Sequence, residues 1–305
     1  MVNDQAAGLR AMREPEKPVE PKKTLKETLS SAIPKAKPVR IVTVASGKGG
    51  VGKTNLSVNL AISLSQLGGR VLLMDADMSL ANVDIMLGLQ TRYNLSHVLD
   101  GEKTLAEVIV EGPAGIRIIP AASGVKRMSQ LSALENAGII NAFSALSDNL
   151  DILIVDTAAG IADSVVSYCR AAQEVVVVVC DEPASITDAY ALIKVLSRDY
   201  KISRFRLVSN MSRSPAHSQR LYEKFSRVCE QFLQVRVEYF GSVPFDNALR
   251  DAVQKQTPVT LCHPTSPSAQ AFAAMAKKLQ TWPVPSGKNG YLQSFVEKLF
   301  KRAKD

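Results

Sequence analysis

The segment Gly47–Thr54, with the sequence G-K-G-G-V-G-K-T, constrains the fold of this chain more than any other feature. It matches the phosphate-loop pattern G-x-x-x-x-G-K-[S/T]. A mostly apolar run typical of a buried strand, Val39–Ala45, ends just before it, and a stretch with a helical pattern, Thr54–Leu67, follows. Glycines let backbone N–H groups wrap around phosphate oxygens, and the helix adds the positive end of its dipole. The segment therefore predicts a nucleotide-binding strand–loop–helix unit.

Two side chains of this loop have expected roles in a nucleotide site. Lys53 would reach the β- and γ-phosphates, and Thr54 would ligate magnesium. GTPases of this class read guanine with an N-K-x-D element, and the chain has none. We therefore expect ATP and Mg²⁺ as the cofactors and ATP hydrolysis as the reaction.

Acidic residues follow two of the other apolar runs. Asp156 closes the run Ile152–Val155, in the position of a Walker B aspartate that holds magnesium. Asp75 and Asp77 follow the run Val71–Met74. Because the carboxyl ends of neighbouring parallel strands border the crevice where ligands bind, these carboxylates should meet at the phosphate loop.

The body of the chain alternates strand-like and helix-like stretches. Near-continuous apolar runs separated by crossover helices such as Ile186–Asp199 indicate a mainly parallel sheet. We expect an α/β fold of the P-loop NTPase type, with about seven to eight strands and helices on both faces. The predicted strands are Val39–Ala45, Arg70–Asp75, Ile116–Pro120, Ile152–Asp156, Glu174–Cys180, Arg204–Asn210 and Val235–Val243.

Four regions follow from these patterns and from proline and charge content. Residues 1–12 predict a short helix, and residues 13–38, rich in Pro, Lys and Glu, predict a linker. Residues 39–282 form the predicted ATPase domain. Residues 283–305 combine a second linker with a terminal helix.

Composition excludes several classes of protein. No run of roughly 18 apolar residues exists, and the N-terminus lacks a signal-peptide core, so we expect a cytoplasmic protein. The four cysteines form no C-x-x-C pair, which argues against an iron–sulfur carrier. The net charge of +8 is concentrated at the two ends, so we expect no direct, specific nucleic-acid binding.

Lys48 is a second lysine inside the phosphate loop. The sequence K-G-G-V-G-K-T resembles the signature of the deviant Walker A (SIMIBI) family, which includes MinD, ParA, the nitrogenase iron protein and the arsenite-pump ATPase. In that family this lysine reaches the nucleotide of the opposite subunit. The resemblance therefore implies that ATP joins two copies of this chain face to face in a homodimer.

The chain is most similar to the MinD/ParA branch of that family, from about Arg40 to Lys278. The resemblance implies that Asp77 positions the attacking water and that Asp75 supports the magnesium region. It also implies that Asn210 and the backbone beyond Pro244 border adenine. The matching stretches are Asp75–Asp77, Leu80–Asp84, Asp156–Gly160, Val208–Asn210 and Gly241–Pro244. Two departures from the pattern, Ser79 and Ala158–Ala159, lie in switch segments.

These inferences assign three sets of site residues. The expected catalytic residues are Lys48, Lys53 and Asp77. The expected nucleotide-binding residues are Gly47, Lys48, Gly49, Gly50, Val51, Gly52, Lys53, Thr54, Asn55, Asn210 and Pro244. The expected metal-binding residues are Thr54, Asp75 and Asp156.

The first residues carry a more specific motif. The stretch Asp4–Arg10 resembles the D-Q-A-x-x-L-R activator motif of the FlhG (FleN, YlxH-related) family of MinD-like flagellar-number regulators. The resemblance implies that this helix binds the FlhF-type GTPase and stimulates its GTP hydrolysis. Family members also restrain a flagellar transcription activator of the FleQ/FlrA type, and flagellar switch (C-ring) proteins are further candidate partners. The partner-binding residues would be Asp4, Gln5, Ala6, Leu9 and Arg10.

The tail Tyr291–Arg302 is amphipathic, with apolar residues over about half of the helical wheel and Lys298 and Lys301 on the other half. This pattern is typical of a helix lying in a membrane surface and resembles the MinD membrane-targeting sequence. We expect reversible binding to anionic lipid at the inner face of the cytoplasmic membrane, with the cell pole as a candidate site. The membrane-binding residues would be Leu292, Phe295, Val296, Leu299 and Phe300. Alternatively the helix packs on the body, or it docks in the monomer and is released in the dimer.

Other members of the superfamily remain as alternatives. A ParA-type DNA-partition ATPase would share the fold and the phosphate loop, but it would need a basic stripe and has no use for an aromatic amphipathic tail. A bacterial tyrosine-kinase domain would want a C-terminal tyrosine cluster, and only Tyr291 lies near that end. A scaffold without activity is disfavoured, because every residue of the expected site is present.

Overall fold

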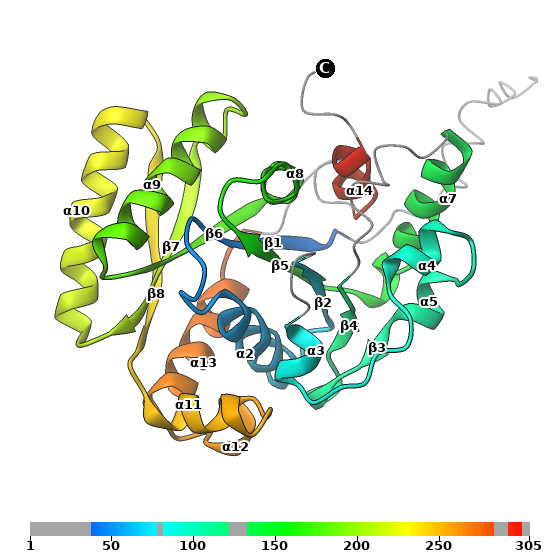
Figure 1. The fold of residues 1–305 in the computed structure, drawn as a ribbon, viewed down its shortest axis with the longest axis horizontal. Coiled ribbons are helices and arrows are strands. Elements are labelled where there is room, and N and C mark those ends of the chain that lie inside the picture. The colour runs from blue at the N-terminus through cyan, green and yellow to red at the C-terminus, as the bar shows by residue number, and fades with distance from the viewer. Residues whose placement is uncertain (1–37, 78–81, 122–132, 284–291, 301–305) are drawn as a thin grey trace, which may run out of the picture. The chain divides into compact units, whose positions relative to one another are not determined.

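The computed structural model describes residues 38–77, 82–121, 133–283 and 292–300. Within them, eight strands form one sheet in the order β3-β4-β2-β5-β1-β6-β7-β8 (Figure 1). Every neighbouring pair is parallel except β3 and β4. The strands are β1 Arg40–Ser46, β2 Val71–Ala76, β3 Val110–Glu111, β4 Arg117–Ile119, β5 Ile152–Ala159, β6 Glu174–Cys180, β7 Arg204–Ser212 and β8 Arg236–Pro244.

Helices cover both faces of this sheet (Figure 1). On one face lie α2 and α13, and on the other lie α7, α8, α9, α10 and α14. The helices of the described ranges are α2 Lys53–Gln66, α3 Val83–Met86, α4 Leu95–Leu99, α5 Leu105–Val108, α7 Ala133–Ser144, α8 Asp163–Ala171, α9 Pro183–Arg198, α10 Pro215–Leu233, α11 Asn247–Gln254, α12 Val259–Cys262, α13 Pro267–Gln280 and α14 Leu292–Phe300. Two short 3₁₀ turns, η1 Pro113–Gly115 and η2 Ser147–Asn149, complete them.

Alternation along the central strands divides the core between the two faces. In β1, Val42 and Val44 pack toward α2 and α13, whereas Ile41 packs toward α7 and α14. Successive side chains of a strand point to opposite faces, so a strand buried on both sides is mostly apolar. All seven residues of β1 and all seven of β6 are buried, and the polar residues among them are Arg40, Thr43, Ser46 and Glu174.

The predicted α/β fold is confirmed, and each of the seven predicted runs forms a strand. The eighth strand, β3, has only two residues and is antiparallel to β4. A two-residue strand carries no apolar period, so the sequence pattern did not locate it. Among the described helices, none has the length and apolar character needed to cross a membrane.

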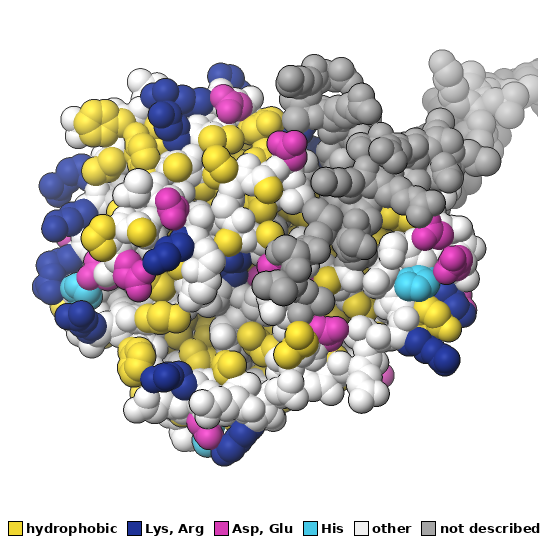
Figure 2. Space-filling model, viewed as in Figure 1, with side chains coloured by type: hydrophobic (Ala, Val, Ile, Leu, Met, Phe, Trp, Pro, Cys, Tyr) yellow, Lys and Arg dark blue, Asp and Glu magenta, His cyan; other side chains and the backbone are white. Residues whose placement is uncertain are grey.

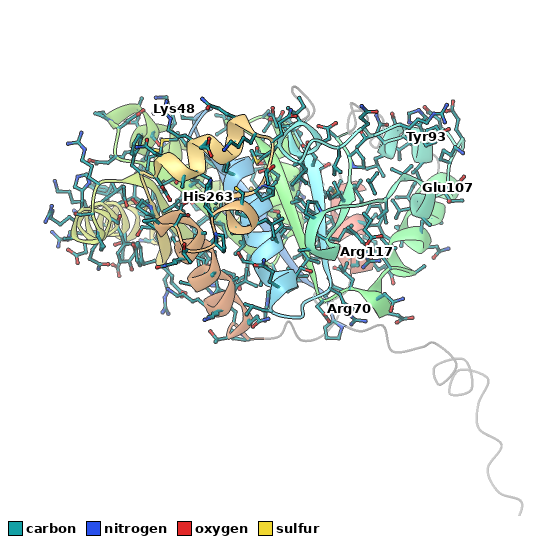
Figure 3. All side chains as sticks on the ribbon, turned by 90° about the horizontal axis from the view of Figure 1, so that it is seen from below. Lys48, Arg70, Tyr93, Glu107, Arg117 and His263 are labelled. Atoms are coloured by element: carbon teal, nitrogen blue, oxygen red, sulfur yellow. The ribbon has the colours of Figure 1, made fainter. Side chains whose placement is uncertain are left out.

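The sheet brings the ends of β1, β2 and β5 together. Asp156 of β5 pairs in register with Val44 of β1 and with Asp75 of β2. The phosphate loop leaves β1 at this same edge. Figure 3 shows the two edges of the sheet on opposite sides of the molecule. Lys48, in the loop after β1, marks the carboxyl edge, and Arg70, which precedes β2, marks the amino edge. The predicted crevice residues therefore lie at the carboxyl edge of the parallel strands.

Candidate nucleotide site

The phosphate loop has the backbone that its glycines predict. Gly50 and Gly52 have φ angles of 75° and 89°, a left-handed conformation that favours glycine. A Cβ on Gly47 would lie 2.1 Å from the backbone carbon of Asp188, and one on Gly52 would lie 2.2 Å from Nδ2 of Asn210. Any larger residue at positions 47 or 52 would therefore displace the packing around the loop.

The side chain of Lys53 lies beneath this loop at the start of α2. Lys53 is only 8% exposed, and its Nζ donates a hydrogen bond to Oγ of Ser46 at 3.1 Å. The Ser46 hydroxyl in turn donates to the backbone oxygen of Lys48 at 2.7 Å. Burial lowers the pKa of Lys53, and the nearby charges of Asp156 and Asp77 oppose that shift. The loop thus holds a buried ammonium group, and a phosphate bound beside it would form a strong charge-assisted hydrogen bond.

Asp156 is the fully buried carboxylate of the site. Its Oδ1 accepts a hydrogen bond from Oγ of Ser57 at 2.8 Å, and its Oδ2 is buried without a hydrogen-bond partner among the described residues. Burial raises the pKa of Asp156 to about 7, opposed by hydrogen bonding from Thr54 and Ser57. A buried, unsatisfied carboxylate oxygen calls for an explanation, and hard oxygen ligands suit magnesium. The residues here therefore fit the magnesium ion that the sequence predicted.

The side chain of Asp75 contacts the backbone on either side of the segment that follows β2. It is 3% exposed, and its oxygens accept hydrogen bonds from the backbone N–H of Asp77 at 3.0 Å and of Asn82 and Val83 at 3.2 Å each. Burial raises the pKa of Asp75 to about 6 despite these bonds. The carboxylate holds both ends of the segment after β2, which carries Asp77. A direct metal contact by Asp75 remains a prediction, and Ser79 lies outside the described residues.

Two adjoining cavities extend from the phosphate loop. A cavity of about 690 Å³ is lined by glycines of the phosphate loop and by Lys53, Thr54 and Asp77. A neighbouring cavity of about 580 Å³ contains Asn210 and Pro244. Both are lined by Gly52, Asn55, Met211, Val253 and Gln254. The predicted phosphate-binding and base-binding residues thus lie in one continuous depression.

Asn210 contacts the phosphate loop. Its Nδ2 donates to the backbone oxygen of Val51 at 2.7 Å, and the residue is 5% exposed. This bond uses one of the two N–H groups of the amide, so one donor and the acceptor Oδ1 remain. A contact between Asn210 and adenine stays a prediction.

Lys48 points away from the loop toward α9. Its Nζ lies 2.7 Å from Oε2 of Glu182, the residue that precedes α9. That hydrogen bond raises the pKa of Lys48. In the single chain, the signature lysine therefore contacts an exposed carboxylate and not the buried part of the site.

Sequence reasoning missed several residues that this geometry brings to the site. Ser57 lies in the predicted helix Thr54–Leu67 and Ser46 directly follows the predicted strand Val39–Ala45, but the prediction gave neither serine a role. Ser57 follows Thr54 by three positions, a spacing that puts both on one helix face and could have identified it. The apolar residues Met211 and Val253 line both cavities although 48% and 39% exposed.

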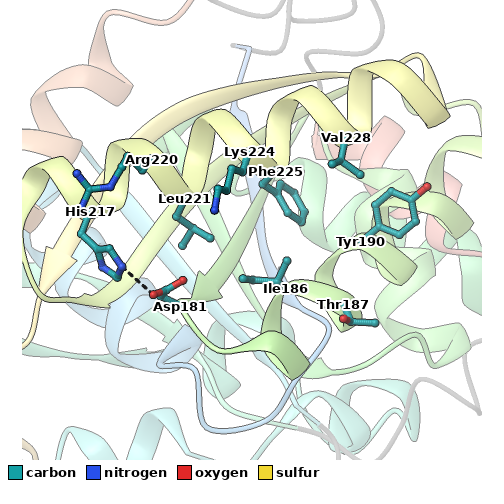
Figure 4. A pocket seen from close by; sticks show the side chains of 10 residues that line it. All are labelled: Asp181, Ile186, Thr187, Tyr190, His217, Arg220, Leu221, Lys224, Phe225 and Val228. Atoms are coloured by element: carbon teal, nitrogen blue, oxygen red, sulfur yellow. Dashed lines mark ion pairs between the residues drawn. The ribbon is translucent and has the colours of Figure 1, made fainter.

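A separate concavity of about 480 Å³ lies between α9 and α10 (Figure 4). Apolar side chains from the two helices line it, with Arg220 and Lys224 on the α10 side. Nε2 of His217 lies 2.8 Å from Oδ2 of Asp181 within it. The lining contains no residue of the phosphate loop, so nucleotide chemistry belongs to the depression described above.

Figure 2 shows Lys and Arg side chains gathered along the α10 edge of the molecule.

The predicted membrane face of α14 is packed on the body. Leu292, Phe295 and Val296 are each at most 1% exposed and lie in one cluster with residues of α7 and α8. The Phe295 ring stacks on Tyr168 of α8 at a centroid distance of 6.5 Å. Leu299 is partly buried against the same cluster. The docked arrangement, kept open as an alternative, is thus the one that the structure describes.

The predicted activator residues, Asp4, Gln5, Ala6, Leu9 and Arg10, lie outside the described residues, as does most of the linker. The side chain of Phe300 is also outside them.

Comparisons with known proteins agree with this geometry. The model of the ParA family, described as an NUBPL iron-transfer P-loop NTPase, matches residues 37–280. The chain is 54% identical over 262 residues to the antiactivator FleN of Pseudomonas aeruginosa, covering 86% of this chain and 94% of that protein. It is 34% identical over 267 residues to the flagellum site-determining protein YlxH of Helicobacter pylori, covering 86% and 90%.

Solved structures show the same fold. The MinC:MinD cell division complex of Aquifex aeolicus matches with a TM-score of 0.63 and 27% identity, over 82% of this chain and 99% of that chain. MinD of Pyrococcus horikoshii, complexed with Mg-ADP, matches with a TM-score of 0.63 and 24% identity, over 80% and 96%. At that identity the second likeness concerns the fold alone.

Proposed function

The chain belongs to the ParA family of P-loop NTPases, in its MinD-like, FlhG-like branch, and is an ATPase; from this premise we propose that it is an ATP-driven dimerising switch regulating flagellar number and placement. The observation that carries the proposal is the 54% identity to antiactivator FleN. It extends through a site in which Lys48, Lys53, Thr54, Asp77 and Asp156 are all present.

Dimerisation is the first part of the switch. The side chain of Lys48 is 39% exposed, and in the dimer it would exchange Glu182 for the phosphates of a second copy. Exposed large apolar side chains around the two cavities would be covered in such a face-to-face dimer. They are Ile85, Met211, Phe245 and Val253. ATP and magnesium would complete the contact, and hydrolysis would end it.

Membrane binding is the second part. The apolar face of α14 is covered by α7 and α8 in the single chain, so the helix must leave that site before it binds lipid. α8 follows β5, the strand that carries Asp156, so a change at the magnesium site can reach the docking surface through one element. The protein would then bind anionic lipid reversibly at the inner face of the cytoplasmic membrane, with the cell pole as the proposed place.

Partner binding is the third part. The head, residues 1–12, would stimulate the FlhF-type GTPase. The body would restrain a transcription activator of the FleQ/FlrA type, in keeping with the name of the relative from Pseudomonas aeruginosa. Flagellar switch proteins are further proposed partners.

Two other functions within the family are less well supported. Iron transfer, named in the family description, lacks a bridging C-x-x-C in this sequence, and the described residues hold no cluster of three His, Cys, Asp or Glu side chains fit for a metal. A DNA-partition ATPase needs a basic stripe, and α10 does expose Arg220, Lys224 and Arg227. Retention of the ATP-bound chain on bare plasmid DNA, but not on liposomes, would favour that second function.

A complementation experiment tests the proposal. The chain would be expressed in Pseudomonas aeruginosa lacking FleN, and flagella would be counted per cell by electron microscopy. The wild-type chain should restore the parental number, whereas Lys53→Ala, produced at the same level, should not. Failure of the wild-type chain, despite normal ATPase activity in the purified protein, would contradict a flagellar role.

A further inference from the structure

Ser57 and Asp156 are joined inside the core of the nucleotide site. Both residues are fully buried. Oγ of Ser57 donates to Oδ1 of Asp156 at 2.8 Å, across 99 positions of sequence. The other carboxylate oxygen, Oδ2, is buried and has no hydrogen-bond partner in the described part of the chain. One oxygen of Asp156 is thus committed and the other is left to a ligand.

The position of Ser57 on α2 means that this hydrogen bond orients Asp156 relative to Thr54. The helix begins at Lys53, so Thr54 and Ser57 lie three positions apart on one face of its first turns. Of these two hydroxyls, that of Ser57 donates the hydrogen bond to Oδ1 of Asp156. A carboxylate rotates about its Cβ–Cγ bond with a broad, two-fold preference. The bond to Oδ1 therefore fixes where Oδ2 lies, relative to the same helix that carries Thr54.

We propose that Ser57 is a positioning residue of the magnesium site: its hydroxyl holds Oδ1 of Asp156 so that Oδ2 is presented to the magnesium shell of a bound nucleotide. Partners that orient metal ligands contribute strongly to metal affinity, because an unheld ligand must be ordered when the metal binds. The inference rests on the magnesium-dependent ATPase site proposed above, and it concerns only how that site is ordered.

The chain offers a matched control in Ser63. It lies on the same helix, is 2% exposed, and its buried hydroxyl has no hydrogen-bond partner among the described residues. Ser63→Ala removes the same atom from the same helix without touching Asp156. Any general effect of losing a buried serine hydroxyl from α2 should therefore appear in both variants.

The test measures ADP binding to the full-length chain by isothermal titration calorimetry, in EDTA and across a series of magnesium concentrations. Wild type should bind more tightly as magnesium rises. Ser57→Ala should bind ADP as wild type does in EDTA, while its magnesium midpoint rises about tenfold. Ser57→Cys, which fills the space with a weak donor, should show the same shift, and Ser63→Ala should show none.

The outcomes separate the inference from the function on which it rests. If the ADP affinity of the wild-type chain did not depend on magnesium concentration, the proposed magnesium site itself would be wrong. A wild-type response with equal midpoints in Ser57→Ala and Ser63→Ala would overturn the role of Ser57 alone. A normal midpoint in Ser57→Cys beside a shifted one in Ser57→Ala would assign the effect to packing, and would also overturn it.

Discussion

Nζ of Lys48 in the phosphate loop lies 2.7 Å from Oε2 of Glu182, the residue that precedes α9. The two side chains are 39% and 58% exposed, and exposed ion pairs stabilise a protein little because water and salt screen them. In the proposed dimer, this weak pair would be replaced by a contact between Lys48 and the triphosphate of a second copy.

Dimerisation should require ATP and Lys48. ATP should produce a dimer and ADP should not, because in the proposed dimer Lys48 makes charge-assisted hydrogen bonds with the triphosphate bound to the second subunit. Lys48→Ala should stay monomeric with ATP and keep part of its ATP affinity. Glu182→Gln, which removes only the ion pair with Lys48, should change the dimer constant by no more than a few-fold. Light scattering with ATP, ADP and no nucleotide checks this, and equal dimer in all three would refute it.

Substitutions of Lys53 and of Asp77 should affect ATP binding and ATP turnover differently. Lys53→Ala removes the buried ammonium group under the loop, so nucleotide binding and hydrolysis should both collapse. Asp77→Ala should bind ATP normally but lose turnover by about a hundredfold or more, since its proposed role is to orient water. Phosphate release and equilibrium binding, measured on the same samples, distinguish the two. Wild-type turnover by Asp77→Ala would remove Asp77 from the catalytic set.

The pH dependence of stability should report on Asp156. Its pKa is raised to about 7 in the folded chain by burial, from about 4 when unfolded. The folded state thus holds a proton that the unfolded state loses, and this stabilisation is complete below pH about 4 and lost as pH rises through about 7. Asp156→Asn stays neutral, so in the nucleotide-free protein it should match wild type in acid and exceed its unfolding free energy at pH about 8 by roughly 2–4 kcal/mol.

Urea unfolding across pH measures that difference. Asp251→Asn serves as the control, because hydrogen bonds from Lys255 and His263 lower the pKa of Asp251. Its contribution has the opposite sign: it is present above the unfolded pKa and is lost as pH falls. A difference between wild type and Asp156→Asn that did not change with pH would contradict a raised pKa.

The tail should bind liposomes only when it leaves its docking site. Sedimentation with anionic vesicles should depend on ATP, and two tails on one dimer should raise avidity by roughly a hundredfold. Phe295→Glu should abolish binding, and it should also cost the body about 3 kcal/mol, because Phe295 is 1% exposed against Tyr168. Gln293→Glu, on the exposed face, should do neither.

Tyr168→Leu provides the complementary variant. It weakens the docking surface without altering the tail, so vesicle binding should increase in the absence of ATP. If Phe295→Glu still sedimented normally, the tail would not be the membrane anchor. If Tyr168→Leu left binding in the absence of ATP unchanged, docking on α8 would not restrain the tail.

A peptide of residues 1–14 should stimulate the partner GTPase without the body. A proline-rich linker separates the motif Asp4–Arg10 from the ATPase domain, so the head must carry its own recognition surface. Ordering on binding costs free energy, so activity should need micromolar or higher peptide. Gln5→Ala or Arg10→Ala should lose stimulation and spare ATP turnover. An inactive peptide beside an active full-length chain would locate the activating surface on the body.

The sequence by itself determined the parts of this protein whose structure depends on residues that are adjacent along the chain. The loop 47–54, its flanking strand and its helix are neighbours along the chain, so their geometry follows from local backbone physics. A continuous apolar run such as Val175–Val179 predicts a strand covered on both faces wherever that strand lies in the sheet. Asp156 was found for the same reason, as the acid that closes such a run.

The tertiary structure alone decided which distant residues meet. Ser57 bonds Asp156, Lys48 bonds Glu182 and Asn210 bonds Val51 across 99, 134 and 159 positions. These contacts depend on the strand order and on how each crossover helix packs, which no linear period encodes.

The tail illustrates the same division. Its amphipathic period establishes that one face must leave water, because burial of apolar surface is favourable wherever it occurs. That period is the same for a lipid surface and for a protein groove. Only the packing of Phe295 on Tyr168 identifies α8 as the cover of that face in the single chain.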